Sequence, residues 1–325
     1  MTRRILAVDG GGSKTDAVLL DTTGQVITQV RGPSSQPQDL GMPRALAVLD
    51  DLVGQIRRQT GTPSGSPVAD QAAVYLSGLD LPREIAAIEP ALRSRNWAPS
   101  LVVDNDTFAV LRAGTQARDA VAVVCGTGIN CVGRNAAGQV SRFAALGEVT
   151  GDWGGGHHLG QQALWHATRA DDGRGPRTAL QEAIAAHFGR PDALSVGIAV
   201  HFHEIADDRL NELAPVVFAV AAGGDPVAGH LVDRMAGEIA ALATVSMRRL
   251  NLLDRPVDLV LGGGVARGRD QRLFAELARQ MHEVNPLTSI VVVDAAPVVG
   301  AALLGLDALA AATDAGERLR AALGG

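Results

Sequence analysis

The chain has 325 residues, 46% of them hydrophobic, with 38 glycines and few aromatic side chains, which predicts a two-domain α/β enzyme with tight loops. Its formal net charge of −6 argues against nucleic acid as a main partner. The sequence shows neither the apolar leader of a signal peptide nor an unbroken apolar span, so we expect a cytoplasmic protein with no membrane partner.

A glycine turn near the N-terminus is the first informative feature. The apolar run at 5–8 predicts a buried strand, and Asp9-Gly-Gly-Gly-Ser-Lys-Thr15 follows it directly. Returning strands are expected at 16–21 and 25–30, so the turn opens a hairpin and not the helix that a P-loop or dinucleotide turn requires. Outward-pointing backbone N–H groups in such a turn favour an anion, above all phosphate. A glycine-rich hairpin without a ligand is the alternative.

Helices and strands alternate through the rest of the first half. In chain order we expect a helix over 39–60, a strand over 72–76, a helix over 83–94, a strand over 101–103 and a helix that starts near Thr107. Asp106 therefore lies between a strand end and a helix start, where a carboxylate can face a cleft and accept a proton. Alternatively, Asp106 caps the helix, a role equally open to Asn105 and Asp104.

The order of strand, glycine turn and returning strands recurs from residue 120. A strand at 120–124 leads into the turn Cys125-Gly-Thr-Gly128, and strands at 129–133 and 139–143 follow. We then expect a largely helical segment from about 158 to 254, a strand over 257–261 that runs into three glycines, a helix over 270–283, a strand over 289–294 and a closing helix from Pro297. The duplication indicates two similar halves with a nucleotide in a cleft between them.

With three glycine junctions in this order, the chain resembles the sugar kinase/hsp70/actin superfamily, and within it the N-acetylglucosamine kinase and BadF/BadG/BcrA/BcrD ATPase family. The resemblance covers nearly the whole chain and rests on residues 8–15, residues 124–131 and Gly151-Asp152 with the glycines that follow. It implies two RNase H-like (actin-like ATPase) domains with a nucleotide and substrate cleft between them. Their expected bounds are 1–115, rejoined by the closing helix at about 296–312, and 116–295. We also expect a homodimer.

The resemblance implies ATP and Mg²⁺ as cofactors, with Asp9 holding the metal ion through water. Two loops would surround the phosphates of ATP, the first with Gly11, Gly12, Ser13, Lys14 and Thr15 and the second with Gly126, Thr127 and Gly128. The adenosine-contacting turn would consist of Gly262, Gly263 and Gly264. Asp106 would be the catalytic base and touch the sugar, and the other substrate-binding residues would be Gln36, Ser77, Gly151 and Asp152.

Three departures from the family pattern surround the implied sugar site. Relatives commonly carry Gly-Asp-Glu-Gly-Ser where this chain has Gly151-Asp-Trp-Gly-Gly155, so Trp153 either stacks on a sugar or fills the space of the lost glutamate. Relatives that bind N-acetylglucosamine often have Asn at the position of Gln36. The adjacent His157 and His158 lack an accompanying acid or cysteine cluster, which favours structural or solvent-facing roles over metal binding. Asp152 could alternatively bind only backbone N–H groups.

The implied activity is ATP-dependent phosphorylation of an amino sugar, first N-acetylglucosamine to its 6-phosphate and alternatively glucosamine or another hexose. A second enzyme class in the family couples ATP hydrolysis to electron transfer through a cysteine-held 4Fe–4S cluster. Cys125 and Cys131 lie instead inside the second phosphate-loop hairpin, which disfavours that activity. The presence of both Asp106 and Asp152 disfavours a non-catalytic ATP-binding regulator.

Overall fold

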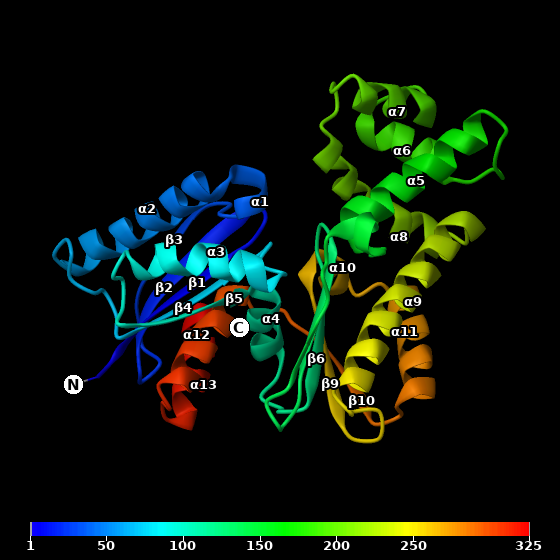
Figure 1. Ribbon diagram of the computed structural model, residues 1–325. Coiled ribbons are helices and arrows are strands. Elements are labelled where there is room, and N and C mark those ends of the chain that lie inside the picture. Colours follow the sequence, from blue (N-terminus) through cyan, green and yellow to red (C-terminus); the bar gives the residue numbers. More distant parts are fainter. Residues whose placement is uncertain (1, 325) are drawn as a thin grey trace. The chain divides into compact units, whose positions relative to one another are not determined.

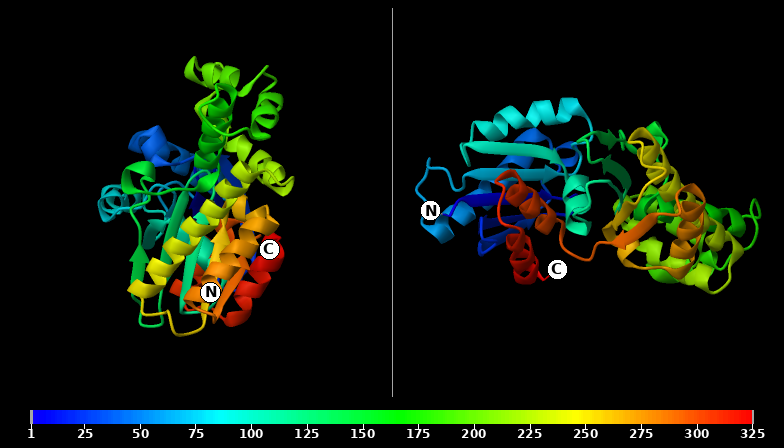
Figure 2. Two further views of the ribbon diagram at one scale, coloured as in Figure 1. Left: turned by 90° about the vertical axis from the view of Figure 1, so that its right-hand side faces the viewer. Right: turned by 90° about the horizontal axis from the view of Figure 1, so that it is seen from below.

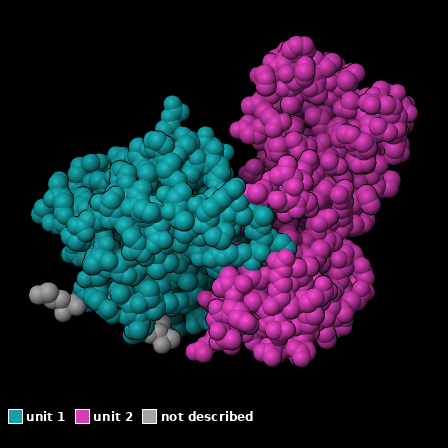
Figure 3. Space-filling view, viewed as in Figure 1, with its two compact units in different colours: residues 1–116, 142–144, 293–325 teal, residues 117–141, 145–292 magenta. Residues whose placement is uncertain are grey.

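The computed structural model describes residues 2–324 and divides the chain into two compact units, coloured separately in Figure 3. Unit 1 contains residues 1–116, 142–144 and 293–325, and unit 2 contains residues 117–141 and 145–292. Each unit is built on one five-stranded sheet in which antiparallel and parallel pairs are mixed.

The sheet of unit 1 has the strand order β3-β2-β1-β4-β5 (Figure 1). Its strands are β1 (Arg4–Gly10), β2 (Lys14–Asp21), β3 (Val26–Pro33), β4 (Gln71–Leu76) and β5 (Ser100–Asn105). The first three are joined by tight turns and pair antiparallel, because a short turn can only reverse the chain. The helical crossovers that follow bring β4 and β5 back parallel to β1.

Helices cover both faces of this sheet (Figures 1 and 2). One core combines Leu6 and Val8 of β1 with apolar residues of α2 (Met42–Thr60) and α3 (Pro82–Arg93). The opposite face packs against α4 (Asp106–Gly114) and α12 (Pro297–Ala308), where Gly305 lies against Ile5. The short α1 (Pro37–Leu40) and the terminal α13 (Thr313–Leu323) complete the unit. Alternate β1 side chains thus enter two cores, and each fully buried aliphatic contributes about 1.5–3 kcal/mol.

Unit 2 has the strand order β10-β9-β6-β7-β8. Its strands are β6 (Ala120–Cys125), β7 (Ile129–Arg134), β8 (Val140–Arg142), β9 (Val257–Gly262) and β10 (Thr288–Val292). The antiparallel β6–β7 hairpin repeats the entry of unit 1, while β9 and β10 run parallel to β6.

Two long helices, α9 (Pro226–Arg249) and α11 (Gln271–Val284), pack together beside the unit 2 sheet (Figure 1). The remaining helical elements are the 3₁₀ turns Gly147–Thr150 and Asp207–Leu213, and α5 (Gly155–Asp171), α6 (Leu180–Phe188), α7 (Ala193–His201), α8 (Ala214–Ala222) and α10 (Gly263–Arg267). Within residues 2–324, no single helix has both the length and the apolar composition to cross a membrane; Asp207–Ala222 and Pro226–Arg249 meet those criteria only jointly, bent by 116°.

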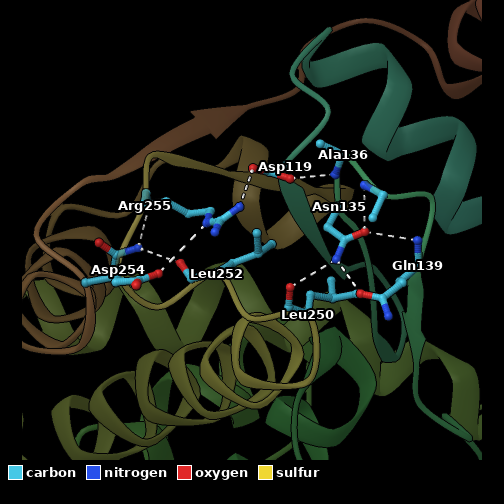
Figure 4. A network of polar contacts seen from close by, with 10 residues as sticks. Asp119, Asn135, Ala136, Gln139, Leu250, Leu252, Asp254 and Arg255 are labelled. Carbon is cyan, nitrogen blue, oxygen red and sulfur yellow. Dashed lines mark hydrogen bonds and ion pairs between the residues drawn. The ribbon is translucent and has the colours of Figure 1, made fainter.

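A polar network fixes the hairpin end of β7 to the connection between α9 and β9 (Figure 4). The Asn135 side-chain amide donates to the Gln139 carboxamide at 2.7 Å and to the Leu250 carbonyl at 3.1 Å. Asp119 accepts from the Ala136 backbone N–H at 2.6 Å and lies 3.8 Å from the Arg255 guanidinium. These bonds hold the turn between β7 and β8. That turn lies beside Ala120, at the opposite end of β6 from the glycine turn.

The strands and helices expected from the hydrophobic pattern are confirmed, but the glycine junction after β9 also starts a short helix, α10 (Gly263–Arg267), that the pattern did not predict. The expected helix over 39–60 is broken at Gly41, whose positive φ of 75° ends α1 and starts α2. The chain does not finish with the helix from Pro297, because α13 follows it. The predicted α/β architecture is thus confirmed, and each unit contains one mixed five-stranded sheet.

Candidate functional site

The parallel strands of unit 1 bring three predicted site segments to one edge of the sheet. Gly10 of β1 pairs with Leu76 of β4, and Leu76 pairs with Asn105 of β5. The glycine turn follows Gly10, Ser77 follows Leu76, and Asp106 follows Asn105. Ser77 donates its backbone N–H to the Gly10 carbonyl at 2.7 Å, which continues the pairing past the strand ends. Carboxyl ends of parallel strands are the usual ligand-binding edge of α/β sheets.

The first glycine turn is closed and leaves little room on its inner side. Gly11 donates its N–H to the Lys14 carbonyl at 2.9 Å. A side chain at Gly10 would collide with Leu76 and Ser35, so this glycine is required by packing. Thr15 is fully buried and its hydroxyl donates to Ser35 at 2.8 Å, so its side chain holds the turn from inside the unit. Lys14, 46% exposed, lies 3.6 Å from Asp16, while Ser13 is exposed.

Asp9 is a buried carboxylate at the end of β1, 5% exposed. Burial raises its pKa well above the ordinary value, the Asp106 and Asp16 carboxylates raise it further, and Lys14 opposes them. Ionisation of Asp9 is therefore disfavoured, first by burial and then by the negative charge of its neighbours. A cation beside the carboxylate would oppose both effects.

Asp106 is the first residue of α4 and is not its cap. The cap is Asn105, whose side-chain oxygen accepts from the Thr107 backbone N–H at 2.9 Å. The capping explanation of Asp106 is therefore wrong, since that role is filled by its neighbour. Burial raises the pKa of Asp106 to about 6, against hydrogen bonds from Thr107 and from its own backbone that lower it. A half-buried carboxylate with this pKa is a stronger base than ordinary Asp and is still ionised at neutral pH.

Gln36 and Ser77 come together beside the glycine turn. The Ser77 hydroxyl donates to the Gln36 side-chain oxygen at 3.4 Å, and that oxygen would lie 3.0 Å from a side chain at Gly12. Ser34, which the sequence did not single out, donates its hydroxyl to the Gly11 carbonyl at 3.1 Å. The Gln36 amide thus lies between the predicted phosphate turn and the predicted sugar-contacting serine.

Unit 2 brings the other two glycine motifs together. Val124 of β6 pairs with Gly262 of β9, so the turn after β6 lies beside the start of α10. Gly263 has φ 90°, and a side chain there would collide with the Cys125 carbonyl. The N-terminus of α5 also meets this turn, because Gly156 and His157 donate backbone N–H groups to the Gly126 and Thr127 carbonyls. Cys125 and Cys131 are buried free thiols, and burial raises the pKa of Cys125 to about 12.

Some of these glycines have no structural reason to be glycine. Gly126, Gly128 and Gly264 lack a positive φ, and a side chain at any of them would enter open space. Neither local backbone conformation nor packing requires the missing side chain. Glycine at these positions instead fits a ligand that approaches the backbone closely.

A cavity of about 280 Å³ in unit 2 contains Asp152 and opens beside the second glycine turn. Its lining residues are Thr127, Gly128, Ile129, Ala145, Gly147, Glu148, Asp152, Gly154, His157, His158 and Gln161. Asp152 accepts from the Gly147 N–H at 3.0 Å and from the Thr150 hydroxyl at 2.7 Å, both at Oδ2. The alternative that Asp152 binds only backbone N–H groups is therefore wrong, because Asp152 also accepts from the Thr150 hydroxyl. Gly151, with φ 84°, is exposed beside it.

The two histidines line this cavity, which the sequence did not indicate. His157 lies 2.8 Å from Asp207, and His158 lies 3.3 Å from Glu148. Burial lowers the pKa of His158, with Glu148 opposing and Arg234 and His157 adding to the decrease. Across residues 2–324, no group of three or more His, Cys, Asp or Glu side chains is arranged to hold a metal ion. Glu148 was missed because only the tertiary contact with His158 distinguishes it from other loop acids.

Trp153 fills space and does not line the cavity. Its indole is 6% exposed, its ring centre lies 5.0 Å from that of His158, and the Arg234 guanidinium carbon lies 4.3 Å from the ring centre. The burial of Trp153 supports the interpretation that it fills the space of the lost glutamate, and not that it stacks on a sugar.

These features define a class of protein. Two α/β units, each entered through a strand, a glycine turn and a returning strand, are the architecture of the actin-like ATPases and sugar kinases. The chain belongs to the BadF/BadG/BcrA/BcrD ATPase family, which matches residues 6–305.

Relatives of known name cover most of the chain. N-acetyl-D-glucosamine kinase of Dictyostelium discoideum is 26% identical over 318 residues, which cover 93% of this chain and 97% of the relative. N-acetylmuramic acid/N-acetylglucosamine kinase of Clostridium acetobutylicum is 25% identical over 262 residues, which cover 80% of this chain and 85% of the relative. A Chromobacterium violaceum crystal structure, provisionally named N-acetylglucosamine kinase, has a TM-score of 0.72 at 23% identity, covering 94% and 99% of the two chains.

Proposed function

We propose that this protein is an ATP-dependent kinase that phosphorylates the 6-hydroxyl of an amino sugar, with N-acetylglucosamine as the first candidate. The observation that carries the proposal is the base at the edge of the unit 1 sheet. Asp106, with its pKa raised to about 6, occupies the same strand-end edge as the glycine turn and the buried Asp9. Phosphoryl transfer needs a phosphate cradle, a metal-neutralised charge and one base, and this edge supplies residues for each.

The residues present fit a magnesium ion held mostly by phosphate and water. Mg²⁺ usually binds proteins through one or two carboxylates and keeps several waters, so a three-carboxylate cage is not required. Such an ion beside Asp9 would favour its ionised form, which burial and the neighbouring carboxylates disfavour. When bound, the ion would neutralise charge on the β- and γ-phosphates. We assign Asp9 to it, through water.

In the proposed reaction Asp106 accepts the proton of the attacking hydroxyl. The sugar oxygen forms a bond to the γ-phosphorus, the bond from that phosphorus to the bridging oxygen of ATP breaks, and ADP leaves. The proton moves to a carboxylate oxygen of Asp106, whose contribution is typically about 10²–10⁴-fold. The raised pKa brings the base closer to the operating pH.

We assign the phosphates of ATP to the two glycine turns and adenosine to the third glycine junction. The first turn would contribute the backbone of Gly11, Gly12 and Ser13 and the side chain of Lys14, while the buried Thr15 supports the turn through Ser35. The second contributes Gly126, Thr127 and Gly128, and adenosine would lie against Gly262, Gly263 and Gly264. Open space at Gly126, Gly128 and Gly264 supports these assignments.

The sugar would be held by Gln36, Ser77, Gly151 and Asp152. The cavity around Asp152 carries two carboxylates, those of Asp152 and Glu148, while none of its lining residues is Lys or Arg. Such a lining favours neutral or ammonium-bearing sugars over sugars with a carboxylate. Glucosamine is therefore the second candidate, because its ammonium group complements the cavity.

The proposal includes a homodimer and a cytoplasmic location, where ATP is supplied. Light scattering of the purified protein tests the first, and fractionation of the source cells tests the second.

The experiment that tests the proposed function is a coupled ADP-release assay across several sugars. N-acetylglucosamine, glucosamine, N-acetylmannosamine, glucose and glucosaminate would each be added to the protein with Mg-ATP. We expect sugar-dependent ADP release with an amino sugar, and at least tenfold less with glucosaminate. ADP release that no sugar stimulates would contradict the proposal.

A further inference from the structure

Asp106 lies between two residues that are held by the same arginine. The Arg142 guanidinium donates to both Asp104 oxygens, at 2.6 and 2.7 Å. Its central carbon also lies 4.4 Å from the ring centre of Phe108. Asp104 is on β5 and Phe108 is in the first turn of α4, so Arg142 contacts the chain on both sides of Asp106.

The arginine's contacts continue into the cap of α4. Asp104 Oδ1, which accepts from Arg142, also accepts from the Asn105 backbone N–H at 2.7 Å. The Asn105 side-chain oxygen caps the helix at Thr107, and its amide donates to Asp80 at 2.9 Å. The orientation of the first turn of α4 therefore depends on a connected set of bonds that begins at Arg142.

Arg142 itself comes from a distant part of the sequence. It ends β8, and residues 142–144 belong to unit 1 together with β5 and α4. A planar guanidinium that binds both oxygens of one carboxylate fixes direction as well as distance, which a lysine cannot do. Its contact with the face of the Phe108 ring adds a second constraint.

We propose that Arg142 is a positioning residue for Asp106, fixing the β5–α4 junction so that the carboxylate meets the attacking hydroxyl. This rests on the proposed function, in which Asp106 is the base. A displacement of about 1 Å at a reacting group can cost about 10²-fold in rate. Loss of Arg142 should therefore lower kcat and leave ATP binding unchanged, because Asp104 and Phe108, which it contacts, flank the proposed base.

The chain offers a matched control at the other end of the same helix. Arg112 in α4 donates to both oxygens of Asp307, at 2.7 and 3.1 Å. It is likewise a two-bond arginine–aspartate pair within unit 1, but it is nearly two helical turns beyond Asp106. Replacing each arginine by Met removes a comparable pair at either end of α4.

The test compares R142M, R112M, D104N and the double variant D104N/R142M by steady-state kinetics and thermal unfolding. We expect R142M to lower kcat by about 10–100-fold, with KM for ATP within about twofold of wild type. R112M should keep kcat within about threefold at a similar change in Tm. Because Arg142 acts through Asp104, the double variant should be no slower than the slower single variant. R142K, which keeps the charge but loses the two-bond geometry, should be intermediate.

Equal losses of kcat in R142M and R112M would overturn the proposal, as would additive losses in the double variant. If R142M fails to fold, the R142K comparison with R112K decides in the same way. Wild-type protein inactive with every sugar would refute the proposed function instead. Hydrogen exchange then still tests the positioning, because R142M should speed exchange of the Thr107 and Phe108 amides about tenfold while R112M should not. Unchanged exchange there would reject it.

Discussion

Replacing Asp106 by Asn should remove activity and raise stability at the same time. The neutral side chain cannot accept the proton of the attacking hydroxyl, so kcat should fall by about 10²–10⁴-fold while ATP affinity stays close to that of wild type. The helix should keep its start, because Asn105 and not Asp106 provides the cap.

The expected gain in stability follows from the pKa of Asp106. Folding raises this pKa from 3.8 to about 6, and a difference of this size corresponds to about 3 kcal/mol at about 1.36 kcal/mol per unit. Solvent screening of a half-buried group reduces the effect, so we expect about 1–2 kcal/mol at pH 8. Because the folded pKa is the higher one, the ionised carboxylate costs stability above pH 6, and that cost fades as the pH falls toward 4.

The assay is urea unfolding of wild type and Asp106→Asn at pH 8 and pH 5, without nucleotide or Mg²⁺. The variant should be more stable at pH 8, and its advantage should fall to about half at pH 5. Asp254→Asn, at an 87% exposed position, is the control and should leave stability unchanged. A less stable Asp106→Asn at pH 8 would refute the burial argument, and retention of more than about a tenth of the activity would show that Asp106 is not the base.

Four further predictions concern the nucleotide and sugar groups. Gly128→Ala should leave Tm unchanged, since its side chain enters open space, yet raise KM for ATP at least about tenfold; a lower Tm with normal KM would contradict this. Asp9→Ala should weaken Mg-dependent turnover with every sugar alike, whereas Asp152→Ala should raise KM for the sugar, and equal effects of both on ATP binding would count against the assignment. Gln36→Asn, one methylene shorter, should improve kcat/KM for N-acetylglucosamine over glucosamine about tenfold, and an unmoved ratio would remove Gln36 from specificity. Glu148→Gln should raise relative activity with N-acetylmuramic acid severalfold, checked in the same assay against Glu283→Gln, and no change would reject charge selection at the cavity.

Local sequence signals predicted the architecture because they report on strand burial and turns. The apolar run before Asp9 and the similar run before Cys125 each form a buried strand that ends in a glycine turn. The break at Gly41 was missed, since the buried helical positions begin only at Ala45 and the positive φ depends on backbone geometry. The second terminal helix was missed as well, because its few apolar positions give a weak pattern.

The candidate site could be predicted only where motifs are contiguous in sequence. Asp9, Asp106 and the glycine turns were proposed in this way, since each lies at or next to the end of a strand. Arg142 and Glu148 gave no such signal. Their importance comes from contacts with Asp104 and His158, which are 38 and 10 residues away in the chain. Pairings of this kind depend on tertiary structure, and one sequence does not encode them as a pattern.

Phosphorus NMR of the reaction products tests the central claim most directly. Wild-type protein would be incubated with Mg-ATP and N-acetylglucosamine, then separately with glucosamine, and the phosphorus signals would be assigned. The account predicts ADP and a sugar 6-phosphate in equal amounts, with no sugar phosphate formed by Asp106→Asn. ADP accompanied only by inorganic phosphate, in the same amount with and without sugar, would contradict it.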